Sequence, residues 1–103
     1  MALITYAQAA ALAVAHEMDA DANVVVMGED VGRGGIFGQY AGLQARFGEQ
    51  RVIDTPISEA VILGAGVGMA LAGLRPIVEM RVVDFALCGG MAGRLPSKTL
   101  RMR

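Results

Sequence analysis

The sequence predicts an α/β domain in which a mostly parallel sheet is flanked by helices. Residues 24–27 form a continuous apolar run, which is typical of a strand buried on both faces. Two further strand-like segments, residues 51–54 and 76–80, are separated by helical segments, and strands that alternate with helices pair in parallel. The composition agrees, because 54% hydrophobic and 18% charged residues exclude a disordered chain, and 103 residues suit one domain.

The first helix is expected over residues 6–19. Thr5 and Gln8 form the pattern of a capping box, and apolar side chains then recur at helical spacing. The polar residues 19–23 predict a turn, which leads into the buried strand at residues 24–27.

Glycines fill the segment between Gly28 and Gly42, which we therefore expect to be a loop. A short helix over residues 43–47 follows and ends at Gly48. After the second strand, Pro56 keeps Thr55 out of the helical region, so residues 55–57 are the turn into the next helix.

The third helix, residues 58–72, begins with Glu59, and the thirteen residues after Glu59 carry no charge. One interpretation is structural: the helix N-terminus favours a carboxylate, and Ser58 caps the first turn. The other is that the acid serves chemistry in a buried cleft, and we favour it. Gly73 ends the helix.

Residues 28–30, 55–59 and 84–85 each follow an expected strand, and open α/β sheets bind ligands beyond the carboxyl ends of their strands. A dinucleotide site is disfavoured, because the G-x-G-x-x-G pattern that starts at Gly64 would need glycine where Met69 stands. These glycines also lie inside the expected helix instead of in the turn before it.

A family resemblance rests on Glu59 with Gly64, Gly68 and Ala72, which reads E-x4-G-x3-G-x3-A and resembles the pyrimidine-side motif of thiamine diphosphate enzymes. Residues 27–32, 54–59, 72–76 and 84–85 follow in the order and spacing of one family. The chain resembles the beta subunit of the decarboxylase component of 2-oxo acid dehydrogenase complexes, pyruvate dehydrogenase type. Residues 1–88 would then be the N-terminal part of a transketolase-like pyrimidine-binding domain.

The resemblance also implies a site. Glu59 corresponds to the catalytic acid, which hydrogen-bonds the aminopyrimidine ring of thiamine diphosphate and relays a proton. Glu29 corresponds to a second acid near the cofactor, Phe85 to an aromatic ring that packs on the pyrimidine, and Ile57 to a cofactor contact. A pocket walled by Ile57, Ile62 and Phe85 would keep Glu59 in its neutral acid form. As structural alternatives, Glu29 is a turn acid and Phe85 a core residue.

By the same resemblance the complete protein decarboxylates pyruvate or a related 2-oxo acid and passes the acyl group to lipoyl groups of an acyltransferase core. Acetoin or a branched-chain 2-oxo acid stays an alternative substrate, and a non-catalytic α/β assembly fragment an alternative role. The chain lacks the G-D-G motif with paired Asn that holds magnesium and diphosphate in these enzymes. We therefore expect an alpha subunit to hold that half of the cofactor in a heterotetramer with a second beta subunit, and the isolated chain to be inactive.

In the family, the helix face of Gly64, Gly68 and Ala72 packs against a neighbouring subunit. The four-residue spacing supports this, since small residues on one face let a second backbone approach closely. The apolar excess of the chain also suggests a surface that a partner covers.

Residues 89–103 depart from the pattern. The segment 94–103 carries four basic residues and no acid, whereas residues 1–93 carry five basic and ten acidic residues. We expect a divergent tail that arises from truncation or a frameshift, and no nucleic-acid partner, because aromatic residues are not interleaved with its charges. The single Cys88 excludes an internal disulfide and favours a reducing, cytoplasmic setting, and the single His16 is too few for a metal cluster, so we expect no metal site. The apolar run 60–74 is shorter than the roughly 20 residues that span a bilayer, so we expect no membrane segment.

Overall fold

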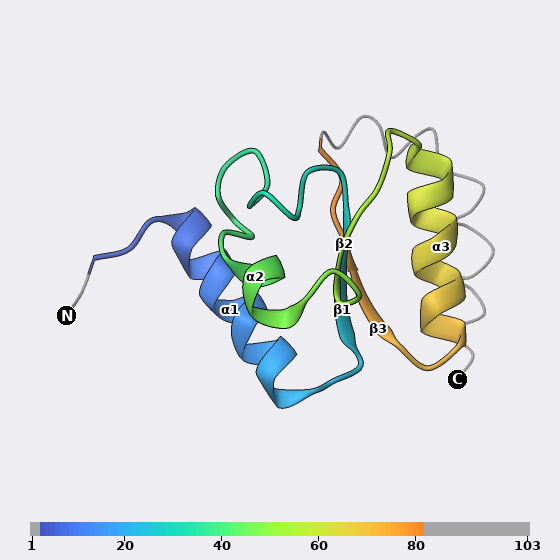
Figure 1. Ribbon diagram of the computed structural model, residues 1–103, viewed down its shortest axis with the longest axis horizontal. Coiled ribbons are helices and arrows are strands. Elements are labelled where there is room, and N and C mark those ends of the chain that lie inside the picture. Colours follow the sequence, from blue (N-terminus) through green and yellow to red (C-terminus); the bar gives the residue numbers. More distant parts are fainter. Residues whose placement is uncertain (1–2, 82–103) are drawn as a thin grey trace.

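The computed structural model describes residues 3–81, which form three layers (Figure 1). A parallel three-stranded sheet lies in the middle, with two helices on one face and one helix on the other. The helices are α1 (Tyr6–Ala20), α2 (Leu43–Phe47) and α3 (Glu59–Leu71), of which α3 lies alone on its face. The strands are β1 (Val24–Gly28), β2 (Val52–Asp54) and β3 (Arg75–Val78). The predicted fold class is confirmed.

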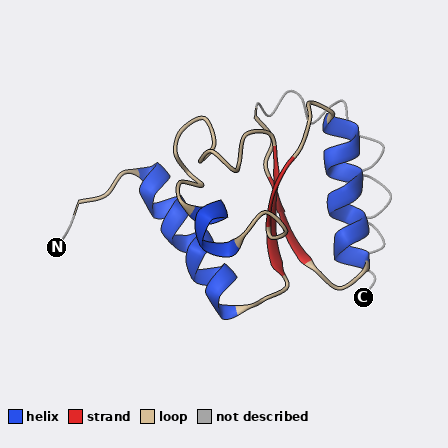
Figure 2. Cartoon of the chain, viewed as in Figure 1, coloured by secondary structure: helices blue, strands red, loops and turns tan. Residues whose placement is uncertain are grey.

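The strand order is β2-β1-β3, and both pairings are parallel. All five residues of β1 are buried, because this strand has a neighbour on each side and helices over both faces. Figure 2 shows the strands crossing between the two helical layers. Val26 pairs with Val52 on one side and with Ile77 on the other. The continuous apolar run of the sequence is thus explained by burial of both strand faces.

The core lies mainly between the sheet and the layer of α1 and α2. Its buried members come from α1, β1, β2, α2 and the loop after β1: Met18, Val24, Val26, Val31, Tyr40, Leu43 and Val52. Side chains alternate along a strand, so Val25 and Met27 face the opposite side, which α3 covers. From α3, Ile62 and Gly66 are the buried residues.

Both ends of α1 are fixed by polar contacts. At its start the Gln8 amide donates to Thr5 Oγ1 (3.1 Å) and the Thr5 amide donates to Gln8 Oε1 (2.8 Å), so the predicted capping box is confirmed. At its end, Arg51 donates to the carbonyls of Met18, Asp21 and Val24 from Nη2 at 2.8, 3.0 and 2.9 Å. One guanidinium therefore ties the last turn of α1 to the start of β1.

The two ends of α3 are closed in different ways. Gly73 has φ of +102°, and the amide of Leu74 donates to the carbonyl of Met69 (3.0 Å), so Gly73 ends the helix as expected. Ser58 occupies the N-cap position, but its side chain makes no capping hydrogen bond, so the structural alternative in which Ser58 caps the first turn is not borne out. Its backbone (φ −166°, ψ 84°) follows the path from Pro56 out of β2, and only its carbonyl serves the helix, by accepting from Ile62.

The third strand was expected over residues 76–80 and spans Arg75–Val78. The amide of Glu79 still donates to the carbonyl of Met27 (2.8 Å), and the chain then leaves the sheet. Asp84, Phe85, Cys88 and the tail 89–103 lie outside the described residues. Within the part described, no helix combines the length and apolar character that a membrane span requires.

Candidate functional site

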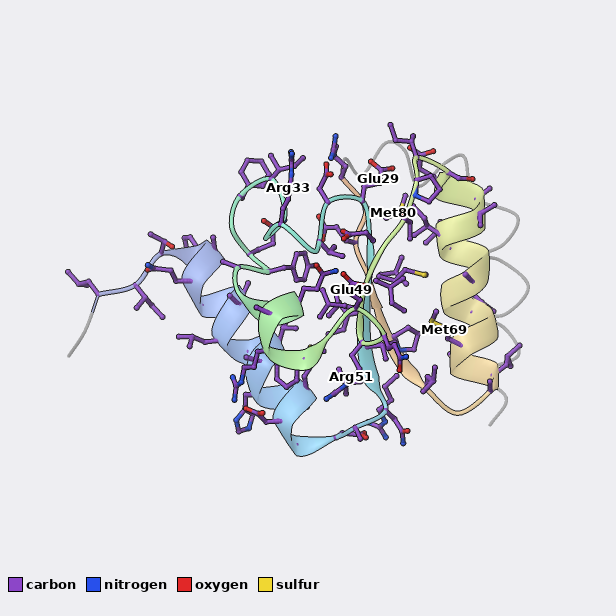
Figure 3. All side chains as sticks on the ribbon, in the orientation of Figure 1. Glu29, Arg33, Glu49, Arg51, Met69 and Met80 are labelled. Atoms are coloured by element: carbon purple, nitrogen blue, oxygen red, sulfur yellow. The ribbon has the colours of Figure 1, made fainter. Side chains whose placement is uncertain are left out.

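Three connecting segments meet at the carboxyl edge of the sheet. The loop after β1 begins at Glu29, residues 55–58 lead from β2 into α3, and residues 79–81 follow β3. The amide of Thr55 donates to the carbonyl of Gly28 (3.0 Å), which holds the first two segments together. Figure 3 shows Glu29 and Met80 at this edge, on the side where α3 begins. The predicted convergence of the first two strand ends is confirmed.

Glu59 is the first residue of α3 and the one charged residue in that helix. It is half-buried, and among residues 3–81 no hydrogen bond or ion pair involves its carboxylate. The first amides of a helix have no partner inside the helix, so the carboxylate lies beside unpaired donors and the positive end of the helix dipole. Within the described part of the chain, Glu59 is thus held at the edge of the sheet with no partner for its carboxylate.

Thr55 adds an unsatisfied group at the same edge. Its Oγ1 is buried and has no hydrogen-bond partner in the described part of the chain. A buried hydroxyl without a partner costs about 1–3 kcal/mol, so Thr55 is an unusual group among the residues that the structure describes.

Glu29 lies directly after β1, and its side chain is 13% exposed. Its Oε2 is 3.6 Å from Nε of Arg81, which follows β3. The same guanidinium hydrogen-bonds the carboxylate of Asp30. Asp30 also forms an ion pair with Arg33 (Oδ1 to Nε, 3.7 Å). Ion pairs therefore link the residues that follow β1 to Arg81, which follows β3.

The loop of residues 28–42 is fastened to the sheet by two carboxylates. Tyr40 donates from its phenol to Glu79 Oε2 (2.6 Å), and Asp54 Oδ1 accepts from the amide of Gly32 (2.7 Å). Burial raises the pKa of the Tyr40 phenol, and the hydrogen bond and negative charge of Glu79 raise it further. Hydrogen bonds to Asp54 in β2 and to Glu79 after β3 therefore hold this long loop against the sheet.

The isoleucines of the predicted apolar wall around Glu59 differ in exposure. Ile57 lies in the connection before the helix and is 77% exposed, whereas Ile62 lies on α3, faces the sheet and is 2% exposed. The predicted pocket also needs Phe85, so it stays a prediction. Phe85 lies outside the described residues.

Three polar residues at this edge were missed by the sequence analysis: Tyr40, Glu79 and Arg81. The rule that ligands bind at the carboxyl ends of strands was applied to residues 84–85 after the third strand. Applied to the residues directly after β3, it would have found Glu79 and Arg81. No local pattern marks Tyr40, since its partner is 39 positions away.

The glycines of α3 lie on two faces. A Cβ on Gly66 would lie 2.5 Å from Cγ2 of Val78, so this glycine permits the contact of α3 with β3. A Cβ on Gly68 would meet nothing within 4 Å, and Gly68 and Ala72 are exposed. The face of the E-x4-G-x3-G-x3-A motif is thus not used for packing on the described sheet. Its expected contact with a second subunit stays a prediction.

Exposed apolar side chains gather in two regions of the described chain. One comprises the start of α1 and the loop after β1, with Leu3, Ile4, Tyr6, Leu12, Ile36 and Phe37. The other follows α3, with Ile57, Val61 and Leu71. Residues 3–81 contain no group of three or more His, Cys, Asp or Glu side chains that could hold a metal ion.

Comparison with known proteins identifies relatives over most of the sequence. The chain is 50% identical over 88 residues to the 2-oxoisovalerate dehydrogenase subunit beta of Bacillus subtilis, covering 84% of this chain and 27% of that protein. It is 48% identical over 90 residues to the pyruvate dehydrogenase E1 component subunit beta of Acholeplasma laidlawii, covering 86% and 28%. A 2-oxoisovalerate dehydrogenase subunit beta from Pseudomonas aeruginosa is 43% identical over 101 residues, 97% of this chain and 28% of that protein.

The chain thus spans about a quarter of the length of these relatives. The last alignment runs past residue 88, and the expected boundary between residues 1–88 and a divergent tail stays a prediction. The model of the family described as transketolase, pyrimidine binding domain, matches residues 2–101. The chain therefore belongs to the family of transketolase pyrimidine-binding domains.

Proposed function

We propose that this chain forms the pyrimidine side of a thiamine diphosphate site in the beta subunit of a 2-oxo acid dehydrogenase. The observation that carries the proposal is the position of Glu59: a carboxylate without a partner among residues 3–81, on the first turn of α3, at the edge where ligands bind in such sheets. Family membership and the names of the relatives support it.

In this proposal Glu59 exchanges a proton with the aminopyrimidine ring through its carboxyl group. Thiamine diphosphate supplies, when bound, the carbon chemistry that cleaves a 2-oxo acid. Thr55 Oγ1 gains the hydrogen-bond partner that it lacks, and Glu29 stands beside the ring. Ile57 is available to contact the cofactor because it is exposed, and Phe85 keeps its proposed place on the pyrimidine.

The proposal needs partners. Thiamine diphosphate has a charged diphosphate, and we assign that half, with its magnesium, to an alpha subunit. Two alpha and two beta subunits would form a heterotetramer, which passes the acyl group to the lipoyl-acyltransferase core. The exposed apolar side chains of α3 and of the α1 region support this assignment, since exposed apolar patches of this kind mark protein interfaces. A cytoplasmic location fits this assembly.

The first two candidate substrates are 2-oxo acids. We give pyruvate as the first substrate to test and 2-oxoisovalerate as the second, because relatives named for each match the chain at similar identity, 48% and 50%. Acetoin is a third candidate. A direct comparison of kcat/KM for the three in the complete assembly decides among them.

The decisive experiment replaces Glu59 with Gln in the complete subunit, assembled with its alpha partner. Gln keeps the volume of the side chain but cannot relay a proton. We expect turnover to fall by about 100-fold or more, while assembly measured by size-exclusion chromatography is unchanged. The matched control is Glu49→Gln, which changes an exposed glutamate between α2 and β2 and should leave turnover as it is.

Near-normal turnover of Glu59→Gln would contradict the catalytic role. The acid would then only stabilise the start of α3, and the role as a non-catalytic assembly fragment would gain support. In that case Glu59→Gln should lower the thermal midpoint slightly, because the favourable contact of a carboxylate with a helix N-terminus is lost.

A further inference from the structure

Arg81, which the proposed catalytic scheme does not use, lies at the centre of a charged group. The group contains two acids from the start of the loop after β1, Glu29 and Asp30, and two arginines, Arg33 and Arg81. Arg81 contacts both acids, whereas Arg33 contacts only Asp30. The two acids and two arginines balance in charge. The position of each carboxylate therefore depends on the arginine that it contacts.

The backbone of Asp30 explains how one guanidinium reaches two successive carboxylates. Side chains of neighbouring residues in an extended strand point to opposite sides. Asp30 has φ of +58°, which is the left-handed conformation and is rare outside glycine. This turn directly after Glu29 lets both side chains lie beside Arg81. A strained backbone that is kept at a candidate site is consistent with a positioning role.

Glu29 depends on Arg81 more than Asp30 does. Its side chain is the most buried of the group, with 13% exposed against 32% for Arg81 and 37% for Asp30, so water screens its interaction least. Within residues 3–81 Arg81 is the sole ion-pair partner of Glu29, and Asp30 keeps Arg33 if Arg81 is removed. Loss of Arg81 therefore releases mainly Glu29.

We propose that Arg81 is a positioning residue that fixes the direction of the Glu29 carboxylate at the cofactor site. This inference rests on the proposed function, in which Glu29 stands beside the pyrimidine of thiamine diphosphate. Arg81 links the end of β3 to the end of β1, so it also fixes the distance between these two segments around the site. Its planar guanidinium is suited to hold two carboxylates, which a lysine ammonium cannot do in the same geometry.

The test is a double-mutant cycle of cofactor affinity in the complete subunit assembled with its alpha partner. Thiamine diphosphate with magnesium is titrated calorimetrically into the parent, Arg81→Gln, Glu29→Gln and the double variant. We expect each single change to weaken binding by about tenfold or more, and the double variant to bind no more weakly than Glu29→Gln alone. The matched control is Arg33→Gln, which should leave the affinity close to that of the parent.

If Arg81→Gln does not assemble, the same cycle is run with Arg81→Lys. This change should weaken cofactor binding by a smaller factor, and it should have no effect on binding in the Glu29→Gln background. Additive losses in the double variant, or an unchanged affinity of Arg81→Gln, would overturn the positioning role. An unchanged affinity of Glu29→Gln would overturn it as well, since Arg81 would have no cofactor contact to position. A parent assembly that does not bind thiamine diphosphate would instead refute the proposed function itself, and the inference with it.

Discussion

The phenol of Tyr40 donates a 2.6 Å hydrogen bond to the carboxylate of Glu79, joining the loop after β1 to the residue that follows β3. Glu79 also lies against β1: a Cβ on Gly28 would be 2.5 Å from the Cβ of Glu79. The absence of a side chain at Gly28 thus lets Glu79 approach the central strand, and Tyr40 covers it from the loop. The edge of the candidate site is built around this contact.

Tyr40 should titrate only at strongly alkaline pH. An ordinary tyrosine loses its proton near pH 10, and burial together with Glu79 raises the pKa of Tyr40 above that value. The unfolded chain therefore releases this proton at lower pH than the folded chain does. The stabilisation is complete below about pH 10 and is lost as the pH rises further.

This is measurable by ultraviolet titration of a Tyr6→Phe variant, because the chain has two tyrosines and Tyr40 is then the one that remains. Its tyrosinate signal should appear only at strongly alkaline pH, together with unfolding. At neutral pH Tyr40→Phe should lower the free energy of unfolding by about 1–3 kcal/mol. Titration of Tyr40 near the ordinary tyrosine value would contradict the Tyr40–Glu79 contact.

Replacement of Arg51 by Lys should destabilise the fold although it keeps the charge. Arg51 donates to three carbonyls and lies over the ring of Phe47, with 5.0 Å between the guanidinium carbon and the ring centroid. An ammonium group cannot reproduce this planar fork. Because carbonyls at the end of α1 lose their partner, we expect a loss of about 1–3 kcal/mol in urea unfolding. Arg33→Lys, at an exposed loop position, is the matched control and should change stability little.

Alanine at Gly66 and at Gly68 should have opposite effects on stability. At Gly66 the new Cβ meets Val78 at 2.5 Å, and such overpacking costs about 1–3 kcal/mol. At Gly68 the space is open, so alanine should stabilise α3 by up to about 1 kcal/mol through helix propensity. Thermal unfolding of the two variants checks both signs.

A compensating change sharpens this comparison. Gly66→Ala should be partly rescued by Val78→Ala, because the clashing methyl group is then absent. If the double variant is as unstable as the sum of the two single changes, Val78 is not what limits the size of residue 66. If Gly66→Ala is neutral, α3 does not lie as close to β3 as the structure has it.

The fold could be read from the sequence where local signals decide the conformation. Four features depend only on residues close by in the sequence. They are the capping box at Thr5, the helix ends at Gly48 and Gly73, and the continuous apolar run of β1. All four were confirmed. The alternative in which Ser58 caps the helix is not borne out, because the path that Pro56 and the end of β2 impose on its backbone does not bring its hydroxyl to an amide of the helix.

The candidate site was predicted less completely, because its contacts are made between distant parts of the chain. The position of Glu59 follows from its helix, but the ion pair of Glu29 with Arg81 requires the register of β1 against β3. Ile57 and Ile62 look equally apolar in sequence, but Ile57 lies in the connection before α3 and is exposed, whereas Ile62 lies on the face of α3 that packs on the sheet.

The strand order β2-β1-β3 has a consequence for how the chain folds as it is made. The central strand is synthesised first, β2 can pair with it once the loop and α2 have been made, and β3 emerges only after the whole of α3 as well. Synthesis proceeds at about 5–20 residues per second, so one apolar edge of β1 stays open for some seconds on the ribosome. Closing that edge needs the contact of longest range in the sheet, which is entropically slow. Chaperones that shield nascent chains would therefore be needed most before Arg75–Val78 has emerged.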